Sequence, residues 1–216
     1  MRLTLLNFLY IAVILNINKD KIMLSLKEYV NESILSGEKA AFDRADVELF
    51  LKTNYKIIGS YTIKETKSGF VVDVEGNIDL KNRDMEYLTN ELFEFGKVDG
   101  IFSCTWCGSL KSLKGAPKKV GTMFNCTGCS SLTSLEGTPE EVYGIFNCSQ
   151  CDSLKSLEGA PEKVGGDFDC SYCSSLKSLE GAPEKVGGNF NCRRYSGKYT
   201  EDDVKKYTEL EGYVIA

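Results

Sequence analysis

Hydrophobic positions in the second half of the chain recur with a period of 22 residues, as from Phe102 to Phe124. Each unit opens with a phenylalanine followed two residues later by a cysteine, and a pair of leucines, a proline turn and a valine follow. The phenylalanines are Phe102, Phe124, Phe146, Phe168 and Phe190, and their cysteines are Cys104, Cys126, Cys148, Cys170 and Cys192. Self-similarity at this period is typical of a solenoid.

Within one unit, the spacing of apolar residues predicts a short strand followed by a bend. Phe168 and Cys170 stand two apart, so both point to the same side of a strand, toward the core. The spacing then becomes three, through Cys173, Leu176 and Leu179, which favours a bend and a short helical or extended return. One unit alone buries too little to fold, so neighbouring units must pair their strands, about 4.8 Å apart.

The repeat frame sets the predicted domain organisation. Pushed back one unit, it places Ile78, Leu80 and Leu88 in phase with Gly100, Phe102 and Leu110. We therefore expect a solenoid over 78–192, built of short parallel β-strands stacked in a curved array, with a short C-terminal cap over 193–216. In that cap, Thr200 reads as the N-cap of a helix, and 212–216 reads as a final strand.

Residues 23–77 are expected to form a small α+β N-terminal cap. An apolar stripe at Leu26, Val30 and Ile34 predicts a first helix, and residues 43–52 predict a second. Alternating segments on either side of 67–69 predict a β-hairpin. The hairpin and the second helix are expected to cover the open end of the solenoid, whereas the first helix could equally dock on a partner.

Residues 1–22 carry the apolar run 3–15, which is shorter than the roughly 20 residues of a membrane-spanning helix. Arg2 precedes it, as in a signal peptide, but a small-residue cleavage site does not follow. The segment is read as a leader or a misassigned start, with a secretion signal, a packed element or an interfacial anchor as alternatives. The expected location is the cytoplasm (the host cytoplasm for a viral protein), and 1–22 leave secretion or membrane association open.

Composition narrows the chemistry. The chain has 26 basic and 31 acidic residues, a net charge of −5, and no histidine. The charge makes nucleic acid a weak candidate partner. The lack of histidine removes the commonest general acid or base and the commonest metal ligand, so we expect a protein that is not an enzyme.

The cysteines offer a competing interpretation. Four Cys-x-x-Cys motifs, ending at Cys107, Cys129, Cys151 and Cys173, have the spacing of some zinc sites. Against zinc, disulfides or redox chemistry, each cysteine already has a place in the repeat, Cys192 has no mate, and the total is the odd number nine. Buried free cysteine behaves as a small apolar residue, so we expect a structural column of thiols with no metal and no cofactor.

The repeat resembles leucine-rich repeats. The segment Ser175–Gly188, identical to Ser153–Gly166, looks like the repeats of uncharacterised leucine-rich-repeat-like proteins of bacteriophages and gut bacteria. The resemblance covers about 47–192, but those relatives often have asparagine where this chain has the second cysteine of each motif. It implies a protein-interaction scaffold and no catalytic chemistry.

The residues alternating with the core positions supply the candidate site, on the concave face of the solenoid. It combines an apolar stripe, a polar stretch, two aromatic residues at strand ends and a basic end: Ile101, Met123, Ile145; Asn125, Asn147, Asp167, Asp169; Trp106, Tyr172; Arg193, Arg194. Exposed apolar rows mark interaction surfaces, although β-forming residues on a stacked sheet would look similar. We expect a protein partner of unknown identity. The alternatives are a zinc-binding or redox protein and an assembly module tethered by its N-terminal helix; the sequence assigns no oligomeric state.

Overall fold

The computed structural model describes residues 43–88, 92–194 and 199–216, and the chain divides into two units after Asn54. In the first unit, helix α3 (Arg44–Asn54) forms where the sequence predicts the second helix. Asp43 and Asp46 cap its start reciprocally, each side chain accepting the other's backbone N–H. The predicted first helix and the leader lie outside the described residues.

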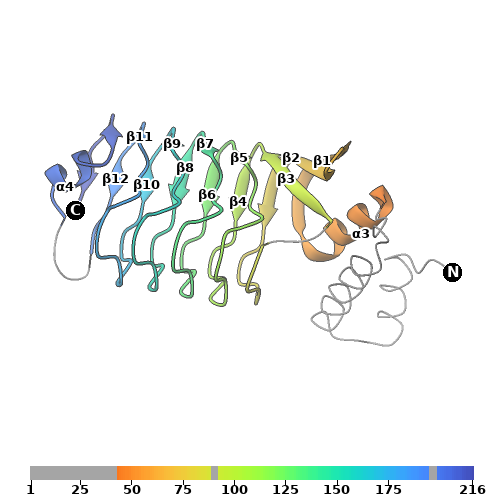
Figure 1. Ribbon diagram of the computed structural model, residues 1–216, viewed down its shortest axis with the longest axis horizontal. Coiled ribbons are helices and arrows are strands. Elements are labelled where there is room, and N and C mark those ends of the chain that lie inside the picture. The colour runs from red at the N-terminus through yellow and green to blue at the C-terminus, as the bar shows by residue number, and fades with distance from the viewer. Residues whose placement is uncertain (1–42, 89–91, 195–198) are drawn as a thin grey trace. The chain divides into compact units, whose positions relative to one another are not determined.

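The second unit is a parallel β-solenoid of about six turns, here called rungs (Figure 1). Each rung contributes one strand to each of two rows. The first row contains β3 (Phe93–Val98), β5 (Lys119–Val120), β7 (Glu141–Val142), β9 (Lys163–Val164), β11 (Lys185–Val186) and β13 (Glu209–Leu210). The second contains β4 (Ile101–Ser103), β6 (Met123–Asn125), β8 (Ile145–Asn147), β10 (Phe168–Asp169), β12 (Phe190–Asn191) and β14 (Val214–Ile215).

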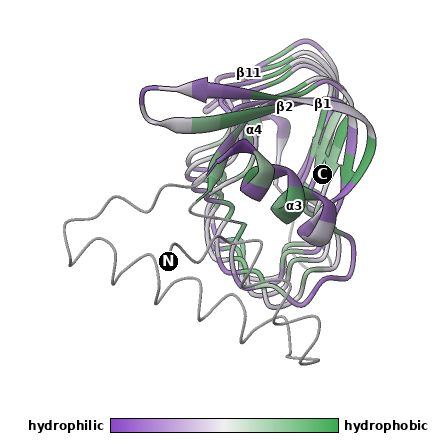
Figure 2. Ribbon diagram, turned by 90° about the vertical axis from the view of Figure 1, so that its right-hand side faces the viewer, coloured by the Kyte–Doolittle hydropathy of each residue, from purple (hydrophilic) through white to green (hydrophobic). Residues whose placement is uncertain are grey.

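The predicted core positions face inward and stack on their own copies. Phe102, Phe124 and Phe146 pair in register across β4, β6 and β8, and their rings stack with centroids 5.3 and 5.4 Å apart. The leucine, valine and cysteine columns are likewise buried. Because equivalent residues superpose, the rungs lie almost one behind another in the end view of Figure 2.

The first row of strands is a feature that the sequence reasoning missed. Its rungs after β3 pair through only two residues each, such as Lys119 and Val120 with Glu141 and Val142, and two residues show no alternation to read. The return past the leucines is made by turns, and the described residues 93–192 contain no helix. Proline at 117, 139, 161 and 183 is buried at that bend.

The N-terminal hairpin forms as predicted, but it belongs to the sheet. Strand β1 (Lys56–Thr66) pairs antiparallel with β2 (Gly69–Asp79), and β2 enters both rows, beside β3 and beside β4. Ile78 pairs with Phe102, and Leu80 takes the place that Cys104 has in the next rung. The first rung is therefore offset by 24 residues, and the predicted matches of Ile78 with Gly100 and of Leu80 with Phe102 are wrong. The reason is a loop two residues longer between Leu80 and Val98 than in later rungs, a change that surface loops tolerate.

The C-terminal segment closes with a further rung. Helix α4 (Glu201–Lys205) starts at Thr200 as predicted, with a capping box to Asp203. After it, β13 and β14 continue the two rows, Leu210 pairing with Val186 and Val214 with Phe190. The predicted final strand is therefore present as β14, and β13 was not foreseen.

Candidate functional site

The second cysteine of each Cys-x-x-Cys motif bonds to the rung before it. Cys129 Sγ donates to the Cys104 carbonyl at 3.1 Å, and Cys151 Sγ donates to the Cys126 carbonyl at 3.2 Å. Cys173 and Cys107 repeat the contact, to the carbonyls of Cys148 and Leu80. Each thiol thus adds a hydrogen bond to a carbonyl at the bend, and the carbonyls of Cys126 and Leu80 also accept a backbone N–H, from Cys129 and Arg83.

The cysteines differ in the direction of their pKa shifts. The hydrogen bond with Cys104 lowers the pKa of Cys129, and the hydrogen bond with Cys148 lowers the pKa of Cys173. All nine cysteines are buried and free. Burial raises the pKa of Cys107 and of Cys192 to about 11, and it raises the pKa of Cys170 well above its usual range. The described residues bring together no group of three or more metal-ligating side chains. Each of the four second cysteines therefore has a defined contact within the stack.

The polar residues of the predicted site also support the fold. In three successive rungs, the side-chain oxygen of Asn125, Asn147 or Asp169 accepts the backbone N–H two residues further on, at 2.9–3.0 Å. Asn191 Nδ2 also donates to Asp169 Oδ2 at 3.1 Å. These side chains hold the bend at the end of each second-row strand. Their spacing to a following Ser or Thr is the signal that could have revealed this role.

The apolar stripe is present on the outer face of the second row. Ile101, Met123 and Ile145 pair in register on β4, β6 and β8, and Ile145 is 38% exposed. Tyr143, which the sequence reasoning did not select, lies two residues before Ile145 and is 60% exposed. The next two rungs carry Asp167 and Asn189 at this position instead. The stripe therefore covers three consecutive rungs and then ends.

Trp106 and Tyr172 occupy the corner that follows the second-row strand. The corner residue of each rung has a left-handed backbone, with φ near +59° at Trp106, Gln150 and Tyr172 and +73° at Gly128. Asn82, with φ +58°, holds the same place in the first rung. Glycine and asparagine tolerate this conformation, whereas it costs other residues about 1–2 kcal/mol. Two large aromatic residues thus stand where the backbone favours small ones.

Arg193 and Arg194 lie at the far end of the same side. Arg193 is exposed, and the Arg194 guanidinium lies 5.1 Å from the ring centroid of Tyr199. The predicted site residues therefore share one flank of the solenoid without forming one cluster. The apolar stripe, the polar column, the aromatic corner and the basic end occupy separate parts of it.

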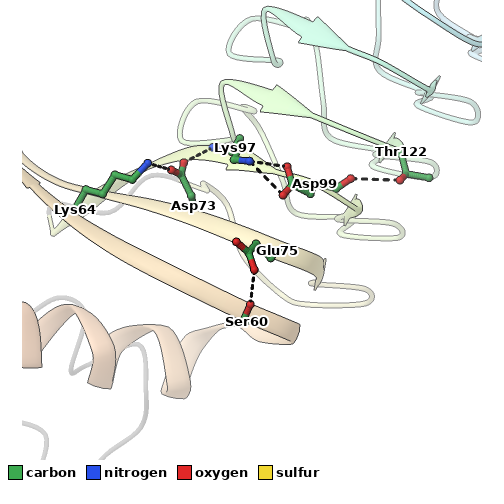
Figure 3. Close-up of polar contacts among 7 residues, drawn as sticks. All are labelled: Ser60, Lys64, Asp73, Glu75, Lys97, Asp99 and Thr122. Atoms are coloured by element: carbon green, nitrogen blue, oxygen red, sulfur yellow. Dashed lines mark hydrogen bonds and ion pairs between the residues drawn. The ribbon is translucent and has the colours of Figure 1, made fainter.

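Charged side chains gather along the first row, on the other side of each rung. Lys119 Nζ and Glu141 Oε2 are 2.7 Å apart across neighbouring rungs. At the hairpin, Asp73 lies at the irregularity in the β2–β3 register and accepts from Lys64 Nζ at 2.6 Å and from the Lys97 N–H at 2.9 Å (Figure 3). Burial alone would raise the Asp73 pKa, but these hydrogen bonds outweigh it and hold the pKa below its ordinary 3.8.

Comparison with known proteins identifies no relative of this chain. No family model, no curated protein and no solved structure matches the chain. The longest helix in the described residues, α3 with 11 residues, is too short to cross a membrane, and none of the described helices qualifies as a span. The assignment of function therefore depends on the surface of the solenoid.

Proposed function

We propose that this chain is a non-enzymatic protein-interaction scaffold whose partner binds the apolar stripe of Ile101, Met123 and Ile145, extended by Tyr143. The observation that carries the proposal is the contrast between rungs. Core positions are repeated almost unchanged, whereas this outward position is apolar in three rungs and polar in the next two. Folding requires the repeated positions and makes no such demand on the outward one.

The surface suits a protein partner for physical reasons. A solenoid holds its outward side chains on a rigid strand framework, so a partner binds without ordering that face first. Ile145 and Tyr143 are exposed, and Ile101 and Met123 are half-buried beside them. Apolar surface grouped in this way is typical of interaction sites, and tyrosine is common among the residues that dominate binding energy. The polar residues at Asn125 and Asn147 flank the stripe and would form its hydrated rim.

Kinship with the leucine-rich-repeat-like proteins of bacteriophages and gut bacteria is part of the proposal. It rests on the repeat motif of 175–188 and on the stacked parallel strands. The two strands per rung and the turn-only return depart from a strand-plus-helix repeat. We propose the cytoplasm of the producing cell, or of its host, as the place of action.

The experiment compares capture of partners by matched variants. Met123→Lys with Ile145→Lys places two charges in the stripe, and Thr133→Lys places one on the exposed outer turn of the Met123 rung. We expect the stripe variant to lose at least 90% of the partner captured by the wild type, on the order of 1.4 kcal/mol or more in binding. The Thr133 variant should retain it.

All three proteins should unfold at similar urea concentrations, because none of the changes touches the core. Equal capture of the same partner by the stripe variant and by the wild type would contradict the proposed interface.

A further inference from the structure

The indole of Trp106 lies flat on the solenoid surface. A Cβ atom on Gly128, in the next rung, would fall 2.7 Å from both Cδ2 and Cζ3 of Trp106 and closer still to Cε3 between them. Near-equal distances to three consecutive ring atoms place that Cβ over the ring face, because a point beside the ring edge would be much farther from the two outer atoms. The inner face of the indole thus rests on Gly128, and the side chain is 49% exposed.

Backbone hydrogen bonds fix the positions of Trp106 and Gly128. The Trp106 N–H donates to the Thr127 carbonyl at 2.8 Å, and the Gly128 N–H donates to the Ser149 carbonyl at 2.9 Å. These bonds fix both corners in their left-handed conformation. A large aromatic residue kept at such a position against its backbone preference is a reason to look for function.

The surface around this ring carries amide and hydroxyl groups and few charges. The corner column continues through Gln150 to Tyr172. Thr105, Ser149 and Ser171, just before the corner, are buried, whereas the position two residues after the corner is exposed and holds a hydroxyl or carboxylate in three rungs, at Ser130, Asp152 and Ser174. The corner segments contain no lysine or arginine, and their only charged residues are Asp152 and Asp169: 103–109, 125–131, 147–153 and 169–175. This composition contrasts with a chain that is 26% charged.

We propose that the corner from Trp106 to Tyr172 binds a neutral oligosaccharide. The C–H face of a pyranose ring is apolar and fits the open face of an indole, while its hydroxyls pair with amide, hydroxyl and carboxylate groups such as Gln150 and Asp152. The four rungs from Trp106 to Tyr172 carry no cation at the corner, whereas the rungs on either side carry Lys81 and Arg83 or Arg193 and Arg194. A ligand without charge fits the stretch between them, whereas a nucleic acid or a phosphorylated ligand needs cations along its length. Successive rungs, about 4.8 Å apart, match the advance of an extended sugar chain by roughly one ring.

This inference does not depend on the proposed protein partner, since the apolar stripe lies on the strands before the corner. It can be tested directly because Trp106 is the only tryptophan of the chain. Its fluorescence reports on this corner alone. The probes are hexamers of glucose (β-1,4), mannose, xylose and N-acetylglucosamine, with a single-stranded oligonucleotide and an unrelated peptide as comparison ligands.

We expect at least one hexasaccharide to shift or quench the Trp106 emission saturably, and the oligonucleotide and peptide to leave it unchanged. Trp106→Asn, which copies the residue that Asn82 provides at the first corner, should keep the fold and lower the affinity measured by calorimetry at least 10-fold. Gly128→Ala should also weaken binding, because its methyl group displaces the indole. Tyr143→Asn, on the apolar stripe, should bind like the wild type.

Three results would overturn the proposal. The first is that none of the four hexasaccharides changes the emission at millimolar concentration. The second is that the peptide or the oligonucleotide changes it instead. The third is that Trp106→Asn binds the sugar as tightly as the wild type while unfolding at the same urea concentration.

Discussion

Individual residues fall into two groups: those whose contacts hold a rung together, and those that point outward and vary between rungs. The cysteines belong to the first kind, because the thiol of Cys129 or Cys151 bonds to a carbonyl of the preceding rung. Asn125 and Asn147 close the bend within their own rungs, because their side-chain oxygens accept the N–H groups of Thr127 and Ser149. A cysteine or an asparagine that looks functional by its chemical type can therefore have a structural role. Only its contacts distinguish a structural role from a binding role.

Loss of one thiol from the column should weaken the fold measurably. Cys151→Ala removes a buried donor to the Cys126 carbonyl, which keeps the Cys129 N–H as a second donor, so the cost should be about 0.5–1.5 kcal/mol. Ser130→Ala, which removes an exposed hydroxyl bonded to the Gly108 carbonyl at 3.4 Å, should change stability by less than about 0.5 kcal/mol. Urea unfolding measures both. Equal midpoints for the two variants would show that the thiol bond contributes nothing.

Thiol reactivity should follow the same geometry. With the pKa of Cys107 and of Cys192 near 11, and all nine thiols buried, the native protein at pH 8 should react with an aromatic disulfide reagent many times more slowly than the urea-unfolded protein. Several thiols that react at once in the native state would contradict the buried column.

Asp73 should make stability depend on pH in the acidic range. Its folded pKa lies below the ordinary 3.8, so its contribution is present above that value and is lost as pH falls through the folded pKa. Asp73→Asn should cost about 1–3 kcal/mol at neutral pH. The gap between variant and wild type should shrink below pH of about 4, as seen in urea unfolding at several pH values. A gap that stays constant down to pH 2.5 would exclude this carboxylate as the source.

At the scale of elements, the sequence predicts a strand where buried residues alternate over three or more positions, even when the strand itself is shorter, as β10 is at Phe168–Asp169. Phe168 and Cys170 identify the second-row strand, and Thr200 identifies the start of α4. Lys163 and Val164 form a two-residue strand that is recognised only by its pairing with the strands on either side. The local sequence therefore gives no signal for the first row. Trp106 packs flat on Gly128, which lies one rung further on. The 22-residue spacing predicts that the two residues are neighbours, but it does not predict the orientation of the indole ring.

Close contact between rungs should make certain glycines irreplaceable. A Cβ on Gly144 would collide with the Thr122 carbonyl of the preceding rung, whereas the nearest atom to a Cβ on Gly108 is Ser130 Oγ at 3.5 Å. Gly144→Ala should therefore destabilise by about 1–3 kcal/mol through overpacking, and Gly108→Ala should be close to neutral. Thermal unfolding compares them. A neutral Gly144 variant would mean that the rungs separate more easily than their hydrogen bonds indicate.

The second unit, 55–216, is a stack in which each rung contacts mainly its two neighbours. The same Phe, Cys, Leu and Val columns run through it, and the first and last rungs adapt the pattern with longer loops before β3 and before β13. Stability in such a stack is nearly a sum over rungs and their interfaces. Specificity then depends on the outward residues that differ, such as Ile145 and Asp167 at one position or Trp106 and Gly128 at another.

The central claim is that each 22-residue unit is a closed, interchangeable rung. Because 153–166 and 175–188 are identical, deletion of 153–174 joins Asp152 to Ser175 and restores an unbroken repeat with one rung fewer. The matched control removes 153–163, half a rung, and puts every later core residue out of register. Urea unfolding followed by circular dichroism is the most direct measurement. The full-rung deletion should keep the β-rich spectrum and a cooperative transition, and the half-rung deletion should lose both. A full-rung deletion that unfolds or aggregates like the half-rung deletion would contradict the claim.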